Sequence, residues 1–407
     1  MREIAARPGF AKDAAPGLMA IRLAVALAII PLISGLAWLA FPGLEGQVLA
    51  LFGVTLIPIS LNSRWIHLGL GQGASPAVAR IVGELAMVAA VLALVQGPED
   101  LLRVPVAHFA GELAAAGLLA FGLARIGGGP LMRPSSWRLG LPVLRQAAPL
   151  AVHAILGLVM FNADFFFLRG FHGQAAVGYY AAAYSLVGFV LNLGVIYYQS
   201  LLPVFAVDRS AERLQRAFRD ALVVVAAIGV PIGFGGVALA TPIIERFFGA
   251  EFGAAALPLA VLIASIPLAV VRNVTQAAQV AGRGEDLVLR SSLAGAICCL
   301  SLNALLIPRF GILGAAVATL GTEAIRTAIS IWLTPRVDCR IPGIGPWLRP
   351  LIAAAVMAVA LTWYQPARVE LAVLAGVSYY ALCLWVLGGT RPLASAIRGS
   401  RSTELAR

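Results

Sequence analysis

Long apolar runs recur along this chain, and short polar segments rich in arginine separate them. The hydrocarbon core of a bilayer is about 30 Å thick, so an α-helix needs roughly 20 apolar residues to cross it. Only 12% of the residues are charged and the mean hydropathy is +0.90, whereas soluble proteins carry about a quarter charged residues. The chain is therefore expected to be an all-α integral membrane protein.

The apolar runs are numerous enough for about twelve membrane-spanning helices. No loop between them exceeds about twenty residues, so the sequence offers no separate soluble domain for an active site. The expected spans lie near residues 20–41, 47–66, 77–96, 102–124, 143–168, 175–205, 218–243, 254–280, 287–307, 312–333, 348–364 and 369–388.

Charge in the loops predicts the orientation of these helices. With the N-terminus in the cytoplasm, 23 of the 30 lysines and arginines fall on the cytoplasmic side, five fall on the outer side and two lie inside the membrane. Basic residues concentrate on the cytoplasmic side of membrane proteins. Both termini are therefore expected in the cytoplasm, and this asymmetry explains the +11 net charge better than nucleic-acid binding does.

One cytoplasmic segment has an amphipathic pattern. In the sequence "AERLQRAFRDAL", Leu214, Phe218 and Leu222 recur at every fourth position and arginines stand around them. Such a pattern is typical of a short helix that lies on the lipid headgroups.

The sequence lacks the common signatures of enzymes and metal sites. It has no Walker A motif, no GxSxG motif and no HExxH motif. Its four cysteines show neither CxxC spacing nor nearby histidines. We expect no enzyme activity, no cofactor and no metal.

Ionisable side chains at membrane depth are the remaining candidates for a functional site. Each costs about 2.5 to 3.5 kcal/mol to insert, so those that persist normally face protein or a water-filled cavity. They are Glu84, His108, Glu112, His153, Asp164, Arg272, Glu323 and Arg326.

Arg272 heads a polar stripe within "VVRNVTQAAQVAGRGE". Helical spacing puts Arg272, Gln276 and Gln279 on one face, and Asn273 follows Arg272 directly. A guanidinium matches phosphate oxygens in bidentate geometry, so this stripe, together with Arg326, is a candidate site for an anionic head group. In the alternative interpretations, Arg272 snorkels toward the cytoplasm or pairs with an acid of a neighbouring span.

Three other residues have simpler interpretations. Glu323 and Arg326 stand three residues apart, and on one helix face they are expected to neutralise each other. Arg272 could also find its partner in Glu323. His153 is expected to be a packing residue.

The first half of the chain contributes three ionisable residues. Glu84 lies mid-span without an expected partner in its own helix, which makes it a candidate for ion coupling. His108 and Glu112, four residues apart, are spaced either for a proton relay or for separate polar contacts near the outer end of their span.

Five sequence segments occur in an order that is typical of a known protein family. The first half contains "RWIHLGLGQ" and "VQGPEDLLRVP", and the second half contains "FNADFFFLRGFHGQAAVGYYAAAYSL", "QAAQVAGRGED" and "SLNALLIPRFGILGAAVATLGTEAIR". Together they resemble bacterial polysaccharide flippases of the multidrug/oligosaccharidyl-lipid/polysaccharide exporter superfamily. The resemblance extends over residues 20–388, and its most specific piece is residues 303–323.

The resemblance implies a two-lobe flippase fold. In this family two six-helix lobes face a central cavity, and two extra helices usually follow. The first span of this chain is similar to the family's third, so a shortened N-terminal lobe is expected. The implied parts are a cytoplasmic tail at 1–19, an N-terminal lobe of about four helices at 20–124, a cytoplasmic linker at 125–142, a C-terminal lobe of about six helices at 143–333, two extra helices at 348–388 and a cytoplasmic tail at 389–407.

The resemblance also implies a role for Asp164. It is similar to the family's acid at the outer mouth of the C-terminal lobe, where it would act as a gate. In the alternative interpretation this carboxylate pairs with Arg169 or caps the turn. Glu84, Glu112 and Glu323 join Asp164 as candidate gating or coupling residues.

The implied function is translocation of a polyprenyl-diphosphate-linked oligosaccharide across a bacterial inner membrane by alternating access, in the biosynthesis of O-antigen or exopolysaccharide. The implied partners are this substrate, membrane lipid, and the polymerase and glycosyltransferases of the pathway, without nucleic acid. The alternatives are a cation-coupled multidrug exporter of the same superfamily, an inactive scaffold of a polysaccharide assembly complex, and a membrane-embedded polymerase or ligase, which would be expected to carry a large outer loop.

Overall fold

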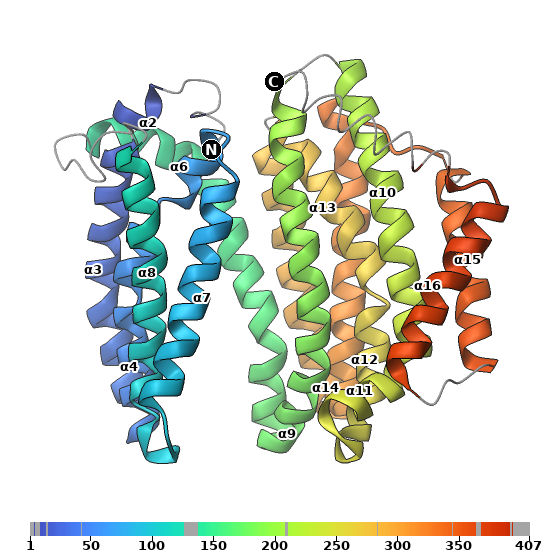
Figure 1. Cartoon of the computed structure of the whole chain (residues 1–407), viewed down its shortest axis with the longest axis horizontal. Helices are drawn as coiled ribbons and strands as arrows, with labels where there is room; N and C mark the ends of the chain where they lie inside the picture. The colour runs from blue at the N-terminus through green and yellow to red at the C-terminus, as the bar shows by residue number, and fades with distance from the viewer. Residues whose placement is uncertain are drawn as a thin grey trace. The chain divides into compact units, whose positions relative to one another are not determined.

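The computed structural model describes residues 9–13, 15–41, 43–125, 137–207, 211–282, 284–343, 345–363 and 368–390, together with Ile4 and Leu393. Within these ranges every regular element is a helix (Figure 1), which confirms the all-α prediction. The predicted linker at 125–142 and the predicted tail at 389–407 lie mostly outside the described residues.

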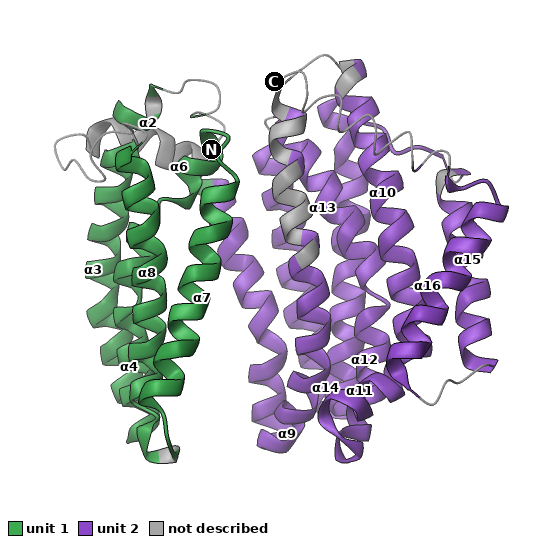
Figure 2. Ribbon diagram, in the orientation of Figure 1, with its two compact units in different colours: residues 1–148 green, residues 149–407 purple. Residues whose placement is uncertain are grey.

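The chain divides into two compact units, residues 1–148 and 149–407 (Figure 2). The first long helix of unit 1 starts at Ala15, inside the predicted N-terminal tail. The helices of unit 1 are α2 (Phe10–Asp13), α3 (Ala15–Ala40), α4 (Leu44–Val54), α5 (Leu56–Leu61), α6 (Arg64–Gly69), α7 (Ala74–Leu94) and α8 (Arg103–Arg125).

Facing glycines let α7 and α8 approach each other closely. A Cβ at Gly83 would lie 2.9 Å from the carbonyl oxygen of Gly111, and a Cβ at Gly111 would lie 2.7 Å from the carbonyl oxygen of Gly83. Small residues permit such contacts in lipid, where no hydrophobic force drives helices together. α6 joins α8 through the fully buried His67, whose Nε2 lies 2.9 Å from the carbonyl oxygen of Leu119.

Unit 2 contains the longest helices of the chain. One buried apolar cluster includes Tyr180, Leu259 and Ile307, and a second includes Phe205 and Phe218. Apart from the first residues of α9, which precede the boundary between the units, unit 2 comprises α9 (Trp137–Val207), α10 (Ala211–Ala238), α11 (Ala240–Phe248), α12 (Ala256–Ile263), α13 (Ile266–Ala281), α14 (Glu285–Leu333), α15 (Gly345–Trp363) and α16 (Val369–Val386).

α9 and α14 are each a hairpin of two helical arms. Gly173 in α9 has φ 78° and ψ −174°, and Gly311 in α14 has φ 55° and ψ −131°. Residues with side chains rarely adopt such a backbone. The Tyr180 hydroxyl donates to the Asp164 carboxylate over 2.6 Å, although sixteen residues separate the two. A straight helix would hold them about 24 Å apart, so the arms of α9 lie side by side.

The hairpins explain how the helices relate to the predicted spans. Among the described residues, nine helices are long and apolar enough to cross a membrane. Each hairpin contains two predicted spans, one on either side of Gly173 or Gly311, and a shorter apolar helix covers Trp347–Trp363. The chain is thus a multi-pass membrane protein, while the count of about twelve spans stays a prediction.

The amphipathic segment does not form a separate helix on the headgroups, so that prediction is wrong. It forms the first turns of α10, which continues to Ala238. Leu214, Phe218 and Leu222 are buried in one cluster with Val274 of α13. An apolar stripe of this spacing can pack in a protein core or lie on a lipid surface, and in this structure it packs in the core.

We expect Gly173→Ala to destabilise unit 2. An alanine with the Gly173 backbone geometry costs about 1–3 kcal/mol. Gly178→Ala is the matched control, because Gly178 lies in an exposed helical position of the same hairpin with open space around it. That change should be neutral or stabilise by up to about 1 kcal/mol. Thermal unfolding of the purified protein measures both, and equal midpoints would contradict the strained turn.

Candidate functional site

Asp164 lies at the junction of the two hairpins of unit 2. Its side chain is 1% exposed. One carboxylate oxygen accepts a hydrogen bond from the Asn303 amide at 2.6 Å. The other accepts from the Tyr180 hydroxyl at 2.6 Å and from the Thr319 hydroxyl at 2.8 Å. The carboxylate therefore connects the second arm of α9 and both arms of α14 to the first arm of α9.

This geometry corrects the local interpretation of Asp164. The side chain neither pairs with Arg169, which is exposed, nor lies free at a helix end. None of the basic side chains that the structure describes forms an ion pair with it. A buried carboxylate held only by neutral donors can stay ionised, or it can take up a proton or a small cation.

The sequence contained a signal for two of these partners. Asn303 and Thr319 each stand eight residues from Gly311, on opposite sides. Once Gly311 is recognised as a turn between antiparallel arms, that equal spacing brings the two side chains to the same depth. The prediction considered only the neighbours of Asp164 along the chain, so it missed these partners.

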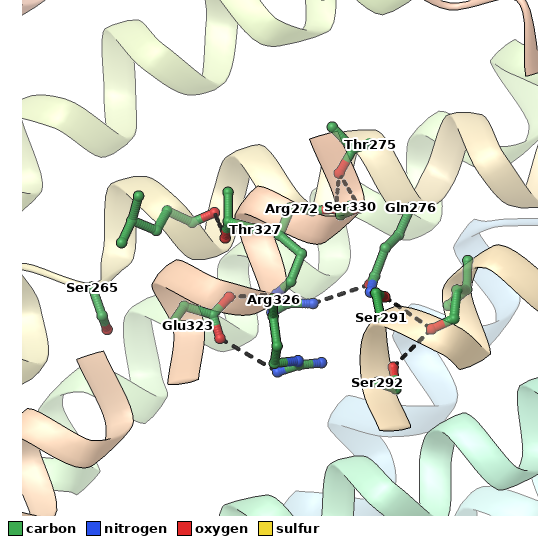
Figure 3. A network of polar contacts seen from close by, with 12 residues as sticks. Ser265, Arg272, Thr275, Gln276, Ser291, Ser292, Glu323, Arg326, Thr327 and Ser330 are labelled. Atoms are coloured by element: carbon green, nitrogen blue, oxygen red, sulfur yellow. Dashed lines mark hydrogen bonds and ion pairs between the residues drawn. The ribbon is translucent and has the colours of Figure 1, made fainter. Parts of the chain in front are cut away.

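A second polar cluster joins α13 to α14 (Figure 3). Glu323 forms an ion pair with Arg272 through Oε1 and a second one with Arg326 through Oε2, the latter at 3.3 Å. The three side chains are 11% to 13% exposed. The expected pairing of Glu323 with Arg326 is present, but the same carboxylate also serves Arg272. Two guanidinium groups and one carboxylate leave one positive charge in the cluster.

The remaining residues of the predicted stripe on α13 lie around this cluster. Gln276 accepts a hydrogen bond from Arg272 Nη1 at 3.0 Å. Gln279 is fully buried and donates to the carbonyl oxygen of Ser330 at 2.9 Å. Asn273 is half-buried beside Gly194 of α9. In this structure Gln279 thus fastens α13 to α14, and Gln276 holds Arg272 in place.

Residues on the first arms of α9 and α14 lie next to the cluster of Arg272, Glu323 and Arg326. Nδ1 of His153 on α9 is hydrogen-bonded to the buried hydroxyl of Ser292 on α14. His153 also lies within electrostatic reach of both Arg272 and Arg326. A contact across 139 residues of sequence leaves no local pattern, so the sequence predicts only a packing residue at His153.

The ionisable residues of unit 1 meet at the contact between α7 and α8. Arg80 forms an ion pair with Glu84 one turn away and lies 3.5 Å from Glu112. The expectation that Glu84 lacks a partner in its own helix is therefore wrong. A cavity of about 20 Å³ lies beside these residues and His108, and it has room for about one water molecule.

His108 and Glu112 do not form the direct relay contact that their spacing allows. No hydrogen bond joins the two side chains, both of which the structure describes, and the buried Nδ1 of His108 has no partner. The ring of His108 instead makes an edge contact with Phe52 at 5.7 Å. The described residues contain no cluster of three or more histidines, cysteines and acids that could hold a metal ion.

We expect Asp164→Asn to destabilise unit 2 by about 1–3 kcal/mol, because an amide offers one acceptor oxygen where three donors converge. Thr319→Ser keeps its hydroxyl donor and should cost less. Thermal unfolding of the purified variants measures the difference. A midpoint for Asp164→Asn equal to that of the unsubstituted protein would contradict the role of this carboxylate as the common acceptor.

Sequence comparison gives the family context of these sites. A family model described as "Polysaccharide biosynthesis protein" matches residues 18–207. The "Probable flippase AglR" of Haloferax volcanii is 26% identical over 234 residues, which cover 54% of this chain and 49% of the relative. The match thus spans about half the length of that curated relative.

The fold is similar to those of solved transporters. The structure titled "Lipid II flippase MurJ, inward closed conformation" has a TM-score of 0.74 at 15% identity, over 92% of this chain and 83% of that one. An outward-facing multidrug resistance MATE transporter of the MOP superfamily has a TM-score of 0.69 at 14% identity, over 83% and 80%. At these identities the likeness establishes the fold. The chain thus shares the fold of these transporters, and its sequence is similar to the family described as polysaccharide biosynthesis proteins over residues 18–207.

Proposed function

We propose that the chain translocates a polyprenyl-diphosphate-linked oligosaccharide from the cytoplasmic to the outer leaflet of a bacterial inner membrane by alternating access. The observation that carries this proposal is the buried cluster of Arg272, Glu323 and Arg326, which keeps a surplus positive charge inside a membrane-embedded unit. The family match at residues 18–207 supports the substrate class.

The diphosphate of such a substrate suits this cluster. A guanidinium keeps its charge in the membrane and can donate two parallel hydrogen bonds to phosphate oxygens. We assign the substrate site to the cluster of Arg272 and Arg326, in which either arginine can bind the diphosphate or position the other, with the amides of Asn273, Gln276 and Gln279 along α13 as further groups for the diphosphate or the sugar.

Four acids are the proposed gating or coupling residues: Asp164, Glu84, Glu112 and Glu323. Asp164 is the best placed of them, because its carboxylate connects both hairpins of unit 2. Uptake of a proton or a small cation by this carboxylate would weaken the hydrogen bonds that hold the hairpins together. Such a change can bias a transporter toward one of two conformations.

A cation-coupled multidrug exporter is the second candidate function. It is favoured by the likeness of the fold to a multidrug transporter and by the two acids that share Arg80 in unit 1. A third candidate is an inactive scaffold in a polysaccharide assembly complex. In the proposed function the chain acts as a transporter and not as an enzyme, both termini are cytoplasmic, and the polymerase and glycosyltransferases of the pathway are its partners.

We expect Arg272→Ala to abolish export of the lipid-linked oligosaccharide while the protein stays in the membrane. The change removes one cation and leaves Glu323 free to neutralise Arg326 alone. A strain that carries the variant in place of the wild-type gene should accumulate the substrate on the cytoplasmic leaflet. Arg290→Ala is the control, because Arg290 on α14 is exposed and paired with Asp286 at 3.4 Å.

Two outcomes would count against the proposal. If deletion of the gene causes no accumulation of lipid-linked oligosaccharide, the chain is not the flippase, and the exporter or the scaffold takes its place. If Arg272→Ala exports normally at equal membrane abundance, Arg272 does not belong to the substrate site.

A further inference from the structure

We propose that Arg326, rather than Arg272, contacts the phosphate of the substrate directly, and that Glu323 is an internal anion that occupies Arg326 until the phosphate displaces it. The inference rests on the function proposed above. It adds which side chain binds the diphosphate, what the diphosphate replaces, and why the empty site is stable in the membrane.

Arg272 is held within the protein by two neighbouring side chains. Its Nε donates to Glu323 Oε1, and its Nη1 donates to Gln276 Oε1 at 3.0 Å. Gln276 is itself 3% exposed and lies 3.5 Å from the Ser291 hydroxyl. A guanidinium held in this way by two neighbours has its Nε committed to Glu323 and positions that carboxylate, whereas the Nε of Arg326 is without a partner.

Arg326 has the opposite character. It is 9% exposed, its Nη1 makes one contact of 3.3 Å with Glu323 Oε2, and its Nε is buried without any hydrogen-bond partner. Figure 3 shows Glu323 as its one dashed contact. A guanidinium carries five N–H donors, and leaving a buried donor unpaired costs free energy. Arg326 is therefore an under-satisfied cation inside the membrane, as expected of a group that awaits an anion.

The surroundings of Arg326 leave room for the side chain and supply polar neighbours. A Cβ at Gly295 would overlap the Arg326 stem, and Nε would lie 3.0 Å from it, so glycine is needed for this placement. Ser292, one helical turn before Gly295, binds His153 across the two first arms.

Charge explains how Glu323 would be displaced. A diphosphate carries more negative charge than a carboxylate and can accept two parallel hydrogen bonds from one guanidinium. When Oε2 leaves Arg326, Glu323 keeps its ion pair with Arg272 through Oε1. Each of the two arginines then has an anion of its own, and the diphosphate, with more than one negative charge, outweighs the single positive surplus of the empty cluster. Before the substrate arrives, the shared carboxylate lowers the cost of burying Arg326.

The test uses the full chain in lipid nanodiscs, with inorganic pyrophosphate as the probe and isothermal titration calorimetry as the measurement. Arg326→Gln should weaken pyrophosphate binding by about ten- to a hundredfold. Arg290→Gln removes an exposed arginine of the same helix and should bind as the wild type does. If Arg326→Gln does not accumulate, Arg326→Lys replaces it, and the loss of paired donors should still weaken binding.

A double-variant cycle separates the two arginines. Arg272→Gln should weaken binding, because Glu323 is then free to pair with Arg326 alone. Glu323→Gln added to Arg272→Gln removes this competitor and should restore wild-type affinity or exceed it. If Arg272 contacts the anion itself, the double variant will stay weak, and that result would overturn the inference. Wild-type affinity in Arg326→Gln, or no binding by either the wild type or the double variant, would overturn it too.

Two further arms identify the source of the phosphate and separate the inference from the proposed function. Phosphatidylglycerol added to phosphatidylcholine nanodiscs should leave pyrophosphate affinity unchanged, and competition that depends on Arg326 would reassign the site to a lipid headgroup. Leaflet assays in the deletion strain test the function by itself. If pyrophosphate binds through Arg326 but deletion of the gene causes no transport defect, the flippase function is wrong and the anion site stands. If deletion causes a transport defect but pyrophosphate binding does not depend on Arg326, the flippase function stands and the inference about Arg326 is wrong.

Discussion

The carboxylate of Asp164 holds the hairpins of unit 2 in register. It accepts hydrogen bonds from Asn303 on one arm of α14 and from Thr319 on the other, so the two arms meet at that depth. Farther from the turn, the same register brings Arg326 against Gly295. The position of the proposed anion-binding arginine therefore depends on the Asp164 carboxylate of α9, which binds Thr319 about two helical turns before Arg326 on α14.

Much of the fold follows from the bilayer and could be predicted from hydropathy. A chain in lipid must satisfy its backbone polar groups internally, so long apolar runs become helices. The breaks expected at 168–175 and 307–312 contain Gly173 and Gly311, the two turns of unit 2. The amphipathic stripe was misassigned because hydropathy alone cannot separate a lipid-facing surface from a core-facing one.

The candidate site was only partly predictable, and the reason is distance along the chain. Membrane depth singled out Arg272, Glu323 and Arg326, because charged side chains there are costly. Spacing rules suggested only partners within one turn, so the sharing of Glu323 by an arginine 51 residues away was one alternative among several. The same limit hid the partners of Asp164. Arg80, by contrast, stands four residues before Glu84 in the same predicted span, so the spacing rule alone could have found this pair.

A shared counter-ion resolves a conflict that any anion site within a membrane faces. A guanidinium without a partner is costly to bury, and one with a carboxylate of its own has no charge to offer a ligand. In unit 2 one carboxylate, Glu323, forms ion pairs with two arginines, which leaves a surplus of one positive charge. In unit 1 the arrangement is reversed, because Arg80 forms ion pairs with both Glu84 and Glu112, which leaves a surplus of one negative charge. The described clusters of the two units thus carry a charge surplus of opposite sign, and only the cluster of unit 2 is largely shielded from solvent.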